Sequence, residues 1–248
     1  KKLQIIKSDI REYNLLKKII KNFDVIIPLA GLVGAPLCKS EKFSAKSINL
    51  DSNLRLFKLV SKNQLIIMPT TNSAYGTGKT GEIFDENSKL NPISIYSEHK
   101  LIVEKELMKH KNSISLRLAT VFGMSPRMRI DLLVNNFVYR AVIDKYIALF
   151  ESHFKRNYVH IRDVSRAFVY CIKNSKNMKN NIFNLGLDNA NLSKKELCEL
   201  IKKKTELNIY EDDYKKDEDQ RNYIVSNKKI LKKGFKFKFS LEDGIDEL

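Results

Sequence analysis

Short apolar runs alternate with amphipathic stretches along the first three quarters of the chain. Continuous apolar residues predict buried strands at 24–29, 64–68, 114–119 and 182–186, and a shorter strand at 3–7. The stretches at 11–21, 40–62 and 95–109 show the spacing of amphipathic helices. Strands that alternate with helices are typical of a parallel sheet covered on both faces, so we expect an α/β fold.

The later part of the chain has a more mixed pattern. A helix is predicted at 131–144, followed by two strands at 147–150 and 156–164. Asp163 is the expected cap of the next helix. Ser193 and Glu196 have the spacing of a capping box, and Ser240 is expected to open the last helix.

Composition narrows the class of protein. With 248 residues and 43% hydrophobic content, the chain can bury the core of one large domain or one and a half. No run of eighteen apolar residues and no signal-peptide pattern occurs, so we expect a soluble, cytoplasmic protein with no membrane partner. Cys38, Cys171 and Cys198 lie far apart without C-x-x-C spacing, which favours buried, reduced thiols over disulfides or a metal site.

The net charge of +16 would suit a nucleic-acid-binding protein. However, the lysines are scattered, and no RNA- or DNA-binding signature with interleaved aromatic residues appears. We therefore expect no nucleic-acid partner and a general preference for anionic small ligands.

Candidate chemistry is concentrated in the segment Y-S-E-H-K, which contains Tyr96 and Lys100. Residues four apart lie on one face of a helix, so the phenol and the ammonium can enter one cavity. A nearby cation lowers the pKa of a phenol from ~10, which would allow the phenol to take a proton from an alcohol. The alternative interpretation is a half-buried tyrosine beside a solvated lysine.

The segment upstream favours the catalytic interpretation. The strand at 64–68 runs into P-T-T-N-S-A-Y-G, which places small hydroxyl groups at the carboxyl end of a sheet, where open α/β folds bind ligands. This strand, the hydroxyl-rich loop and the later Y-S-E-H-K together resemble the active-site layout of the extended short-chain dehydrogenase/reductase family, the NAD-dependent nucleotide-sugar epimerases and dehydratases.

The resemblance implies a catalytic set of three residues. Tyr96 would be the base, Lys100 would lower its pKa and hold the nicotinamide ribose, and Thr71 would orient the sugar oxygen. For NAD binding it implies Asp9, Ile10, Leu29, Ala30, Gly31, Thr70, Tyr96 and Lys100. Asp9 also has the alternative of capping the following helix, and Asn49 lies either behind the cofactor or on the surface.

For the nucleotide sugar, the resemblance implies contacts from Asn72, Ser73, Arg127, Arg156 and Arg221, with Arg129 near them. It also implies that the strands at 147–150 and 156–164 pair with each other beside the nucleotide. Solvated loop arginines are the alternative for Arg127 and Arg129. Sugar dehydratases of this family carry an acid in the two positions after the catalytic threonine, and here those positions are Asn72 and Ser73. A 4,6-dehydratase is therefore disfavoured, and oxidation at a sugar carbon remains.

The sequence departs from the family at its beginning. It contains no G-x-x-G-x-x-G loop, so the resemblance implies a Rossmann-type doubly wound sheet that lacks its first two strands and its glycine-rich loop. We expect an NAD-binding Rossmann domain over 1–123. Residues 124–248 would form mainly a smaller α+β nucleotide-sugar lobe, with some segments that return to the Rossmann sheet.

Longer strings resemble a narrower group, the GDP-heptose 4-dehydrogenases of capsule heptose pathways. They are I-I-P-L-A-G-L-V-G-A-P-L-C, L-A-T-V-F-G-M-S-P-R-M-R-I-D-L-L-V-N and H-F-K-R-N-Y-V-H-I-R-D-V. The group implies a 4-keto GDP-sugar product in surface polysaccharide biosynthesis, and a homodimer formed through the helices at 40–62 and 95–109. A 4-epimerase of the same family, or a non-catalytic NAD- or RNA-binding protein on this fold, is the alternative.

Overall fold

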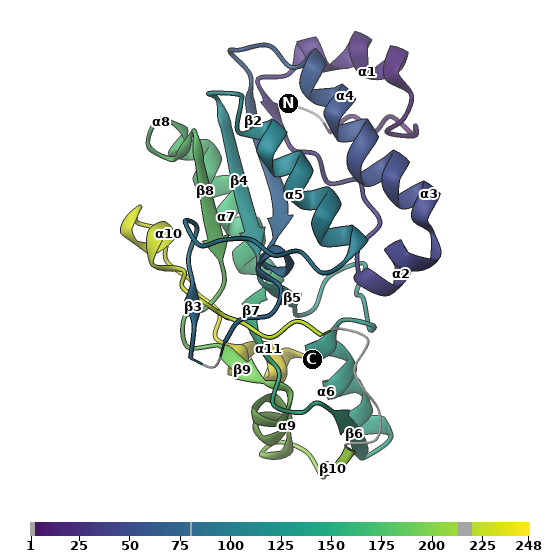
Figure 1. Ribbon diagram of the computed structural model, residues 1–248, viewed down its shortest axis with the longest axis vertical. Coiled ribbons are helices and arrows are strands. Elements are labelled where there is room, and N and C mark those ends of the chain that lie inside the picture. The colour runs from purple at the N-terminus through teal and green to yellow at the C-terminus, as the bar shows by residue number, and fades with distance from the viewer. Residues whose placement is uncertain (1–2, 80, 213–219) are drawn as a thin grey trace.

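The computed structural model describes residues 3–79, 81–212 and 220–248 (Figure 1). Its α-helices are α1 (Tyr13–Ile19), α2 (Ala35–Ser40), α3 (Lys42–Ala45), α4 (Ser52–Leu59), α5 (Ile95–Leu107), α6 (Leu133–Ile143), α7 (Ile161–Lys173), α8 (Ser175–Met178), α9 (Lys194–Lys202), α10 (Lys228–Lys232) and α11 (Leu241–Glu247). Two short 3-10 helices, η1 (Ile20–Asn22) and η3 (Asn72–Tyr75), and a π-helix, η2 (Lys46–Asp51), complete the helical segments.

The strands are short except at the centre. They are β1 (Val25–Ile26), β2 (Leu65–Thr71), β3 (Ile83–Phe84), β4 (Ser113–Leu118), β5 (Thr120–Phe122), β6 (Tyr146–Phe150), β7 (Lys155–His160), β8 (Asn181–Leu185), β9 (Asn191–Ser193), β10 (Asn208–Asp212) and β11 (Ile224–Val225). The main sheet has the order β1-β2-β4-β8, and every neighbouring pair in it is parallel.

Strand β2 shows why the sheet is covered on both faces. Ile66 and Met68 pack with residues of α4 and α5, whereas Ile67, one position between them, packs with residues of α7. Successive side chains of a strand point to opposite faces, so an apolar run without alternation requires a helix layer on each side. Figure 1 shows α5 in front of the sheet and α7 behind it. The predicted doubly wound α/β Rossmann-like fold is confirmed.

A second cluster of elements lies beyond the carboxyl ends of the main strands. It contains the sheet β5-β7-β9, the parallel pair β6-β10 and the helices α6, α9 and α11, which surround a separate apolar core. The chain leaves this cluster through α7 and returns to the main sheet with β8 (Figure 1). The space between the main sheet and this cluster is where a ligand can bind in an open α/β fold.

Several sequence-based expectations about elements were wrong. Residues 3–7 do not form a strand: Leu3 is 87% exposed, and no strand within the described chain pairs with this segment. The strands β6 and β7 do not pair with each other, because β6 pairs with β10 and β7 pairs with β5 and β9. Apolar runs indicate strands, but they do not encode which strands pair.

Of the caps expected for α7, α9 and α11, two are confirmed and one is wrong. The capping box of Ser193 and Glu196 is confirmed, and Ser240 caps α11 together with Asp243. Asp163 does not cap α7. His160 does so instead, because its Nδ1 accepts from the backbone N–H of Arg162.

Asp163 has a different role inside the fold. Its carboxylate accepts from the backbone N–H groups of Lys238 and Phe239, so it fixes the chain that leads into α11. The three cysteines are buried and unpaired, as expected. None of the described helices combines the length and the apolar character needed to cross a membrane.

Candidate active site

The start of α5 is fixed by a capping box. Ser94 accepts from the backbone N–H of Ser97, and the Ser97 hydroxyl contacts the backbone N–H of Ser94 in return. This arrangement satisfies backbone donors at the first turn and sets where the helix begins. Tyr96 and Lys100 consequently lie in the first two turns, next to the carboxyl end of β2.

Thr71 is the last residue of β2, and its side chain organises the turn that follows. Its hydroxyl accepts from the backbone N–H of Ser73 at 3.1 Å and donates to the Ser73 hydroxyl at 2.9 Å. The Thr71 hydroxyl also lies close enough to the phenol of Tyr96 to favour its ionised form. The structure thus brings the tyrosine and the threonine into contact.

Lys100 is buried in the same place. Its Nζ donates to the backbone carbonyl of Pro69 at 3.1 Å, and only 7% of the residue is exposed. Burial disfavours the charged ammonium and lowers the pKa of Lys100 to about 8. A lysine with this pKa can carry or release a proton near neutral pH.

The phenol of Tyr96 does not have the lowered pKa that we expected from its lysine neighbour. Burial raises the pKa of Tyr96 to about 12, and the charges of Arg221 and Arg129 oppose that rise, as does the hydrogen bond with Thr71. The ammonium of Lys100 is directed at the Pro69 carbonyl. In this structure the arginines, not the lysine, are therefore the main cations that favour the phenolate.

These side chains border one cavity of about 300 Å³ at the carboxyl ends of β1, β2 and β4. Its wall consists of Leu29, Gly31, Val33, Gly34, Ala35, Pro69, Thr70, Thr71, Ser73, Ser94, Tyr96, Lys100, Leu118, Ala119, Thr120, Val121, Arg129, Leu132 and Arg221. Apolar strand ends form one part of the wall, and hydroxyl, ammonium and guanidinium groups form the other. This mixture suits a flat aromatic ring joined to a polar, anionic ligand.

The loop after β1 is held against this cavity by Asn49. The Asn49 side chain accepts from the backbone N–H of Leu32 and donates to its carbonyl, both at 2.8 Å. A Cβ at Gly31 would lie 3.1 Å from the Asn49 oxygen, so glycine allows this close approach. Asn49 is buried behind the cavity wall, which excludes the surface alternative.

Five of the eight residues expected at the cofactor line the cavity, and three do not. Leu29, Gly31, Thr70, Tyr96 and Lys100 line the cavity. The others, Ala30, Asp9 and Ile10, lie outside its wall.

Asp9 is engaged close to its own position in the chain. It forms an exposed ion pair with Arg11 and accepts from the Arg11 backbone N–H at 2.8 Å, and these hydrogen bonds lower the pKa of the carboxyl to about 2. The helix cap at α1 is Glu12, so Asp9 stabilises the turn before the helix and is not its N-cap.

Thr70 lines the cavity, but its hydroxyl is committed elsewhere. It donates to Oε2 of Glu104 at 2.9 Å and lies 2.8 Å from the Ser115 hydroxyl, both in the buried interior. We missed Glu104 at the sequence level. Its position four residues after Lys100, on the same helix face, was the signal that could have identified it.

Only two of the five residues expected at the substrate line the cavity. Ser73 and Arg221 line the cavity, and the Arg221 guanidinium donates to the Ser73 hydroxyl. Asn72 is fully buried, and neither its oxygen nor its nitrogen has a hydrogen-bond partner among the described residues. A buried amide without partners is costly and is suited to binding a ligand.

Two of the predicted arginines lie away from the cavity wall. Arg127 is exposed, and Arg156 is buried with its guanidinium over the ring of Tyr223. Arg129 lines the cavity in place of Arg127, two positions away, and is paired with Asp131. The loop conformation, which the sequence pattern does not encode, decides which of these arginines faces inward.

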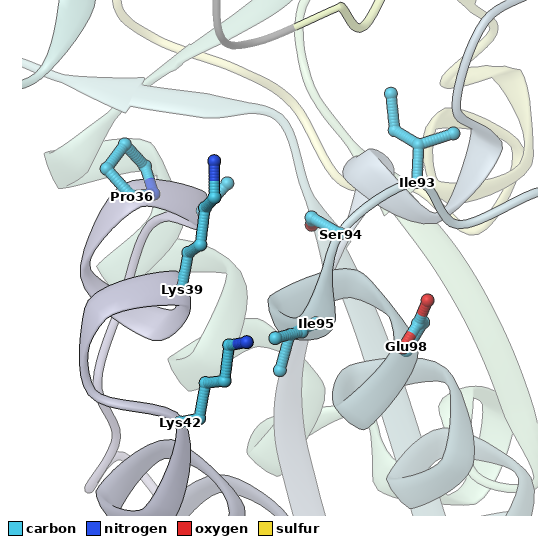
Figure 2. Close-up of a pocket in the computed structure, with 8 residues that line it drawn as sticks. Pro36, Lys39, Lys42, Ile93, Ser94, Ile95 and Glu98 are labelled. Carbon is cyan, nitrogen blue, oxygen red and sulfur yellow. The ribbon is translucent and has the colours of Figure 1, made fainter.

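A second groove adjoins the cavity. It has a volume of about 400 Å³, lies between α2–α3 and the start of α5, and shares Ala35 and Ser94 with the cavity wall. Figure 2 shows Lys39 and Lys42 on one side of it and Glu98 on the other. The cavity therefore opens beside the first turn of α5, where both signs of charge are present.

Comparisons with known proteins agree with this geometry. The profile of the NAD dependent epimerase/dehydratase family matches residues 1–186 of the 248. The uncharacterized UDP-glucose epimerase YtcB of Bacillus subtilis is 28% identical over 157 residues, which are 60% of this chain and 48% of that protein. The bifunctional polymyxin resistance protein ArnA of Wigglesworthia glossinidia brevipalpis is 29% identical over 132 residues, 49% of this chain and 20% of that protein.

The fold is similar to that of solved enzymes. The UDP-glucose 4-epimerase of Thermus thermophilus, in complex with NAD, superposes with a TM-score of 0.83 at 18% identity, over 97% of this chain and 81% of that one. The chain spans less than half the length of the two curated relatives. Because the family profile covers three quarters of its residues, the chain belongs to the NAD dependent epimerase/dehydratase family.

Proposed function

We propose that the protein containing this chain uses NAD to oxidise carbon 4 of a nucleotide-linked sugar. The single observation that carries this proposal is that Thr71, Tyr96 and Lys100 border one cavity, with the phenol beside Thr71. We further propose a GDP-sugar such as GDP-heptose as the substrate, in surface polysaccharide biosynthesis, because of the longer strings that resemble that group.

NAD fits the residues present around the cavity. Gly31 accommodates the Asn49 side chain that holds this loop against the cavity, and Lys100 Nζ has donors beyond the one used on the Pro69 carbonyl. Lys100 would hold ribose hydroxyls, and the apolar strand ends Leu118 and Val121 would contact a ring. When bound, NAD supplies the hydride acceptor.

The protein's own groups would then move the proton. Tyr96 would take the proton of the sugar hydroxyl while the hydride leaves the same carbon, so that a ketone forms. Thr71 would hold the oxygen in place, and the charges of Arg221 and Arg129 would stabilise the phenolate. The uptake of a proton by the phenolate is favourable because the phenol that forms has a raised pKa, so Tyr96 is a strong base once it is ionised.

The sugar-nucleotide contacts that we propose follow from the cavity wall. Ser73 would face the sugar, and Arg221 with Arg129 would meet the diphosphate or another anionic group. Asn72 lies outside the wall, but its buried amide has no hydrogen-bond partner among the described residues, so we retain it as a sugar contact. Arg127 and Arg156 are the weaker candidates, because they lie outside the wall. Neither Asn72 nor Ser73 is an acid that could expel water, so we do not propose a dehydratase.

The test is to incubate the whole protein with NAD and a panel of GDP-, UDP- and dTDP-sugars, and to follow carbon 4 by NMR. A 4-keto sugar with reduced cofactor is the expected result. A carbon-4 epimer without net reduction would instead identify a 4-epimerase. A protein that converts none of these sugars but binds RNA with steep salt dependence would be a binding module on this fold.

A further inference from the structure

A third residue continues the helical stripe of Tyr96 and Lys100. Glu104 lies four positions beyond Lys100 on α5, so the three side chains stand one above another on one face of the helix. Glu104 is buried, with 4% of the residue exposed. A buried carboxylate on the catalytic face requires a reason, because its burial is costly unless it is fully paired.

Each member of the stripe contacts a different residue at the end of β2. Tyr96 lies beside Thr71, Lys100 donates to the carbonyl of Pro69, and Glu104 accepts from the hydroxyl of Thr70. Two consecutive strand residues, 69 and 70, are thus hydrogen-bonded to α5, and the next, Thr71, lies beside Tyr96 of the same helix.

Glu104 is held from the opposite side by Arg117 of β4. Arg117 Nη2 lies 2.7 Å from Oε1 of Glu104, and its Nη1 donates to the Tyr75 hydroxyl at 3.0 Å. Glu104 Oε2 also accepts from Ser115 at 2.7 Å. Tyr75 is the last residue of η3, the turn that begins after Thr71, so the network contacts the strand end on both sides of that threonine.

A fully paired buried network of this kind is rigid. Removing one partner leaves an uncompensated charge, so the arrangement has few alternatives. Fixing the rotation of Thr70 about the strand axis also fixes the direction of its neighbour Thr71. A displacement of about 1 Å at a catalytic group can reduce the rate by roughly a hundredfold.

We propose that Glu104, held by Arg117, is a positioning residue that sets Thr71 against Tyr96 through Thr70. This inference rests on the proposed function, since it assigns a role within the same site. It assigns no chemical step to Glu104, which does not line the cavity.

The sharpest variant is Thr70→Val, which removes one hydroxyl and keeps the shape and the Glu104–Arg117 pair. The matched control is Ser115→Ala, which also removes one hydroxyl donor to Glu104. Ser115 lies on β4, 2.8 Å from the Thr70 hydroxyl, and its removal keeps the Thr70–Glu104 hydrogen bond. Thr70→Ser restores the hydroxyl. Changing Glu104 itself would leave Arg117 buried and unpaired, so that variant is a poorer choice.

In the whole protein, Thr70→Val is expected to lower kcat roughly tenfold or more, with KM within about threefold of wild type. Thr70→Ser and Ser115→Ala are expected to keep kcat within about threefold. Equal losses of kcat in Thr70→Val and Ser115→Ala, or no loss in Thr70→Val, would overturn the proposal and leave a purely structural ion pair.

Hydrogen exchange gives a readout that does not depend on activity. Thr70→Val is expected to speed amide exchange in residues 71–76, whereas Ser115→Ala leaves that segment unchanged. Unchanged exchange at 71–76 in Thr70→Val would overturn the inference. If the wild-type protein oxidises no nucleotide sugar, the proposed function fails, while the exchange comparison still decides whether Glu104 fixes this segment.

Discussion

The burial of Lys100 at this cavity costs folding free energy. Its ammonium is buried against the carbonyl of Pro69, and burial lowers its pKa from 10.5 to about 8. Between these two values the unfolded chain holds a proton that the folded protein has lost, so stability rises with pH across that window. Below pH 8 the buried charge costs about 3 kcal/mol of folding free energy.

This cost leads to a prediction for Lys100→Met. The variant is expected to be more stable than wild type near neutral pH by about 2 kcal/mol, because it loses the buried charge but also one hydrogen bond worth ~1 kcal/mol. The difference is expected to shrink above pH 8 and to reverse to about 1 kcal/mol in favour of wild type near pH 10.5, where only the lost hydrogen bond remains. Urea unfolding of both proteins at neutral and alkaline pH measures it, and a variant less stable than wild type at neutral pH would contradict the buried charge.

Arg221 leads to a prediction about pH and rate. Burial raises the pKa of Tyr96 to about 12, and Arg221 is the first of the groups that oppose the rise. Activity that needs the phenolate therefore increases with pH, and removal of this cation in Arg221→Met should move that increase to higher pH. The pH profiles of sugar oxidation for wild type and variant measure the shift.

The matched control for that experiment is Arg140→Met, which removes an exposed guanidinium paired with Asp144 on α6. Its pH profile is expected to coincide with that of wild type. Identical profiles for Arg221→Met and Arg140→Met would show that Arg221 does not influence the phenol.

At the scale of elements, the turn after β2 depends on Gly76. Gly76 has a φ of +74°, and a Cβ there would lie 2.1 Å from the backbone oxygen of Asn91. Gly76→Ala is therefore expected to destabilise the protein by more than about 2 kcal/mol and to reduce activity, because the turn holds Thr71 and Ser73. Urea unfolding together with the sugar assay measures both effects.

Gly81 offers the control for this substitution. Its φ of +78° is similar, but a Cβ there would meet nothing within 4 Å. Gly81→Ala is expected to cost only about 1 kcal/mol, from the backbone conformation alone. Equal costs for the two substitutions would mean that the contact with Asn91 is unimportant.

The elements that sequence patterns predicted well are those set by local signals. The start of α5, the buried strand β2 and the capping boxes at Ser193 and Ser240 follow from hydrophobic runs and short polar motifs. The pairing of β6 with β10, and the contact of Asp163 with the backbone of Lys238 and Phe239, depend on distant segments. No local pattern contains those contacts.

For the candidate site, too, local motifs predicted some residues, whereas other contacts depend on the fold of the whole molecule. Motif spacing was enough to place Thr71, Tyr96 and Lys100 at one cavity. It did not reveal that Arg129 rather than Arg127 faces inward, that Arg156 packs on Tyr223, or that Thr70 is attached to Glu104. These outcomes depend on loop geometry and on burial, which are properties of the assembled fold. The homodimer remains a prediction.

The central claim is that Tyr96 removes a proton while a hydride leaves carbon 4 of the bound sugar. The most direct measurement uses the whole protein, NAD and a nucleotide sugar deuterated at carbon 4. Deuterium is expected to appear in the reduced cofactor in wild type. In Tyr96→Phe its transfer should fall by roughly a hundredfold or more, while Tyr146→Phe, at an exposed tyrosine, transfers it normally. Undiminished transfer in Tyr96→Phe, or transfer from no tested sugar by wild-type protein that binds NAD, would contradict the account.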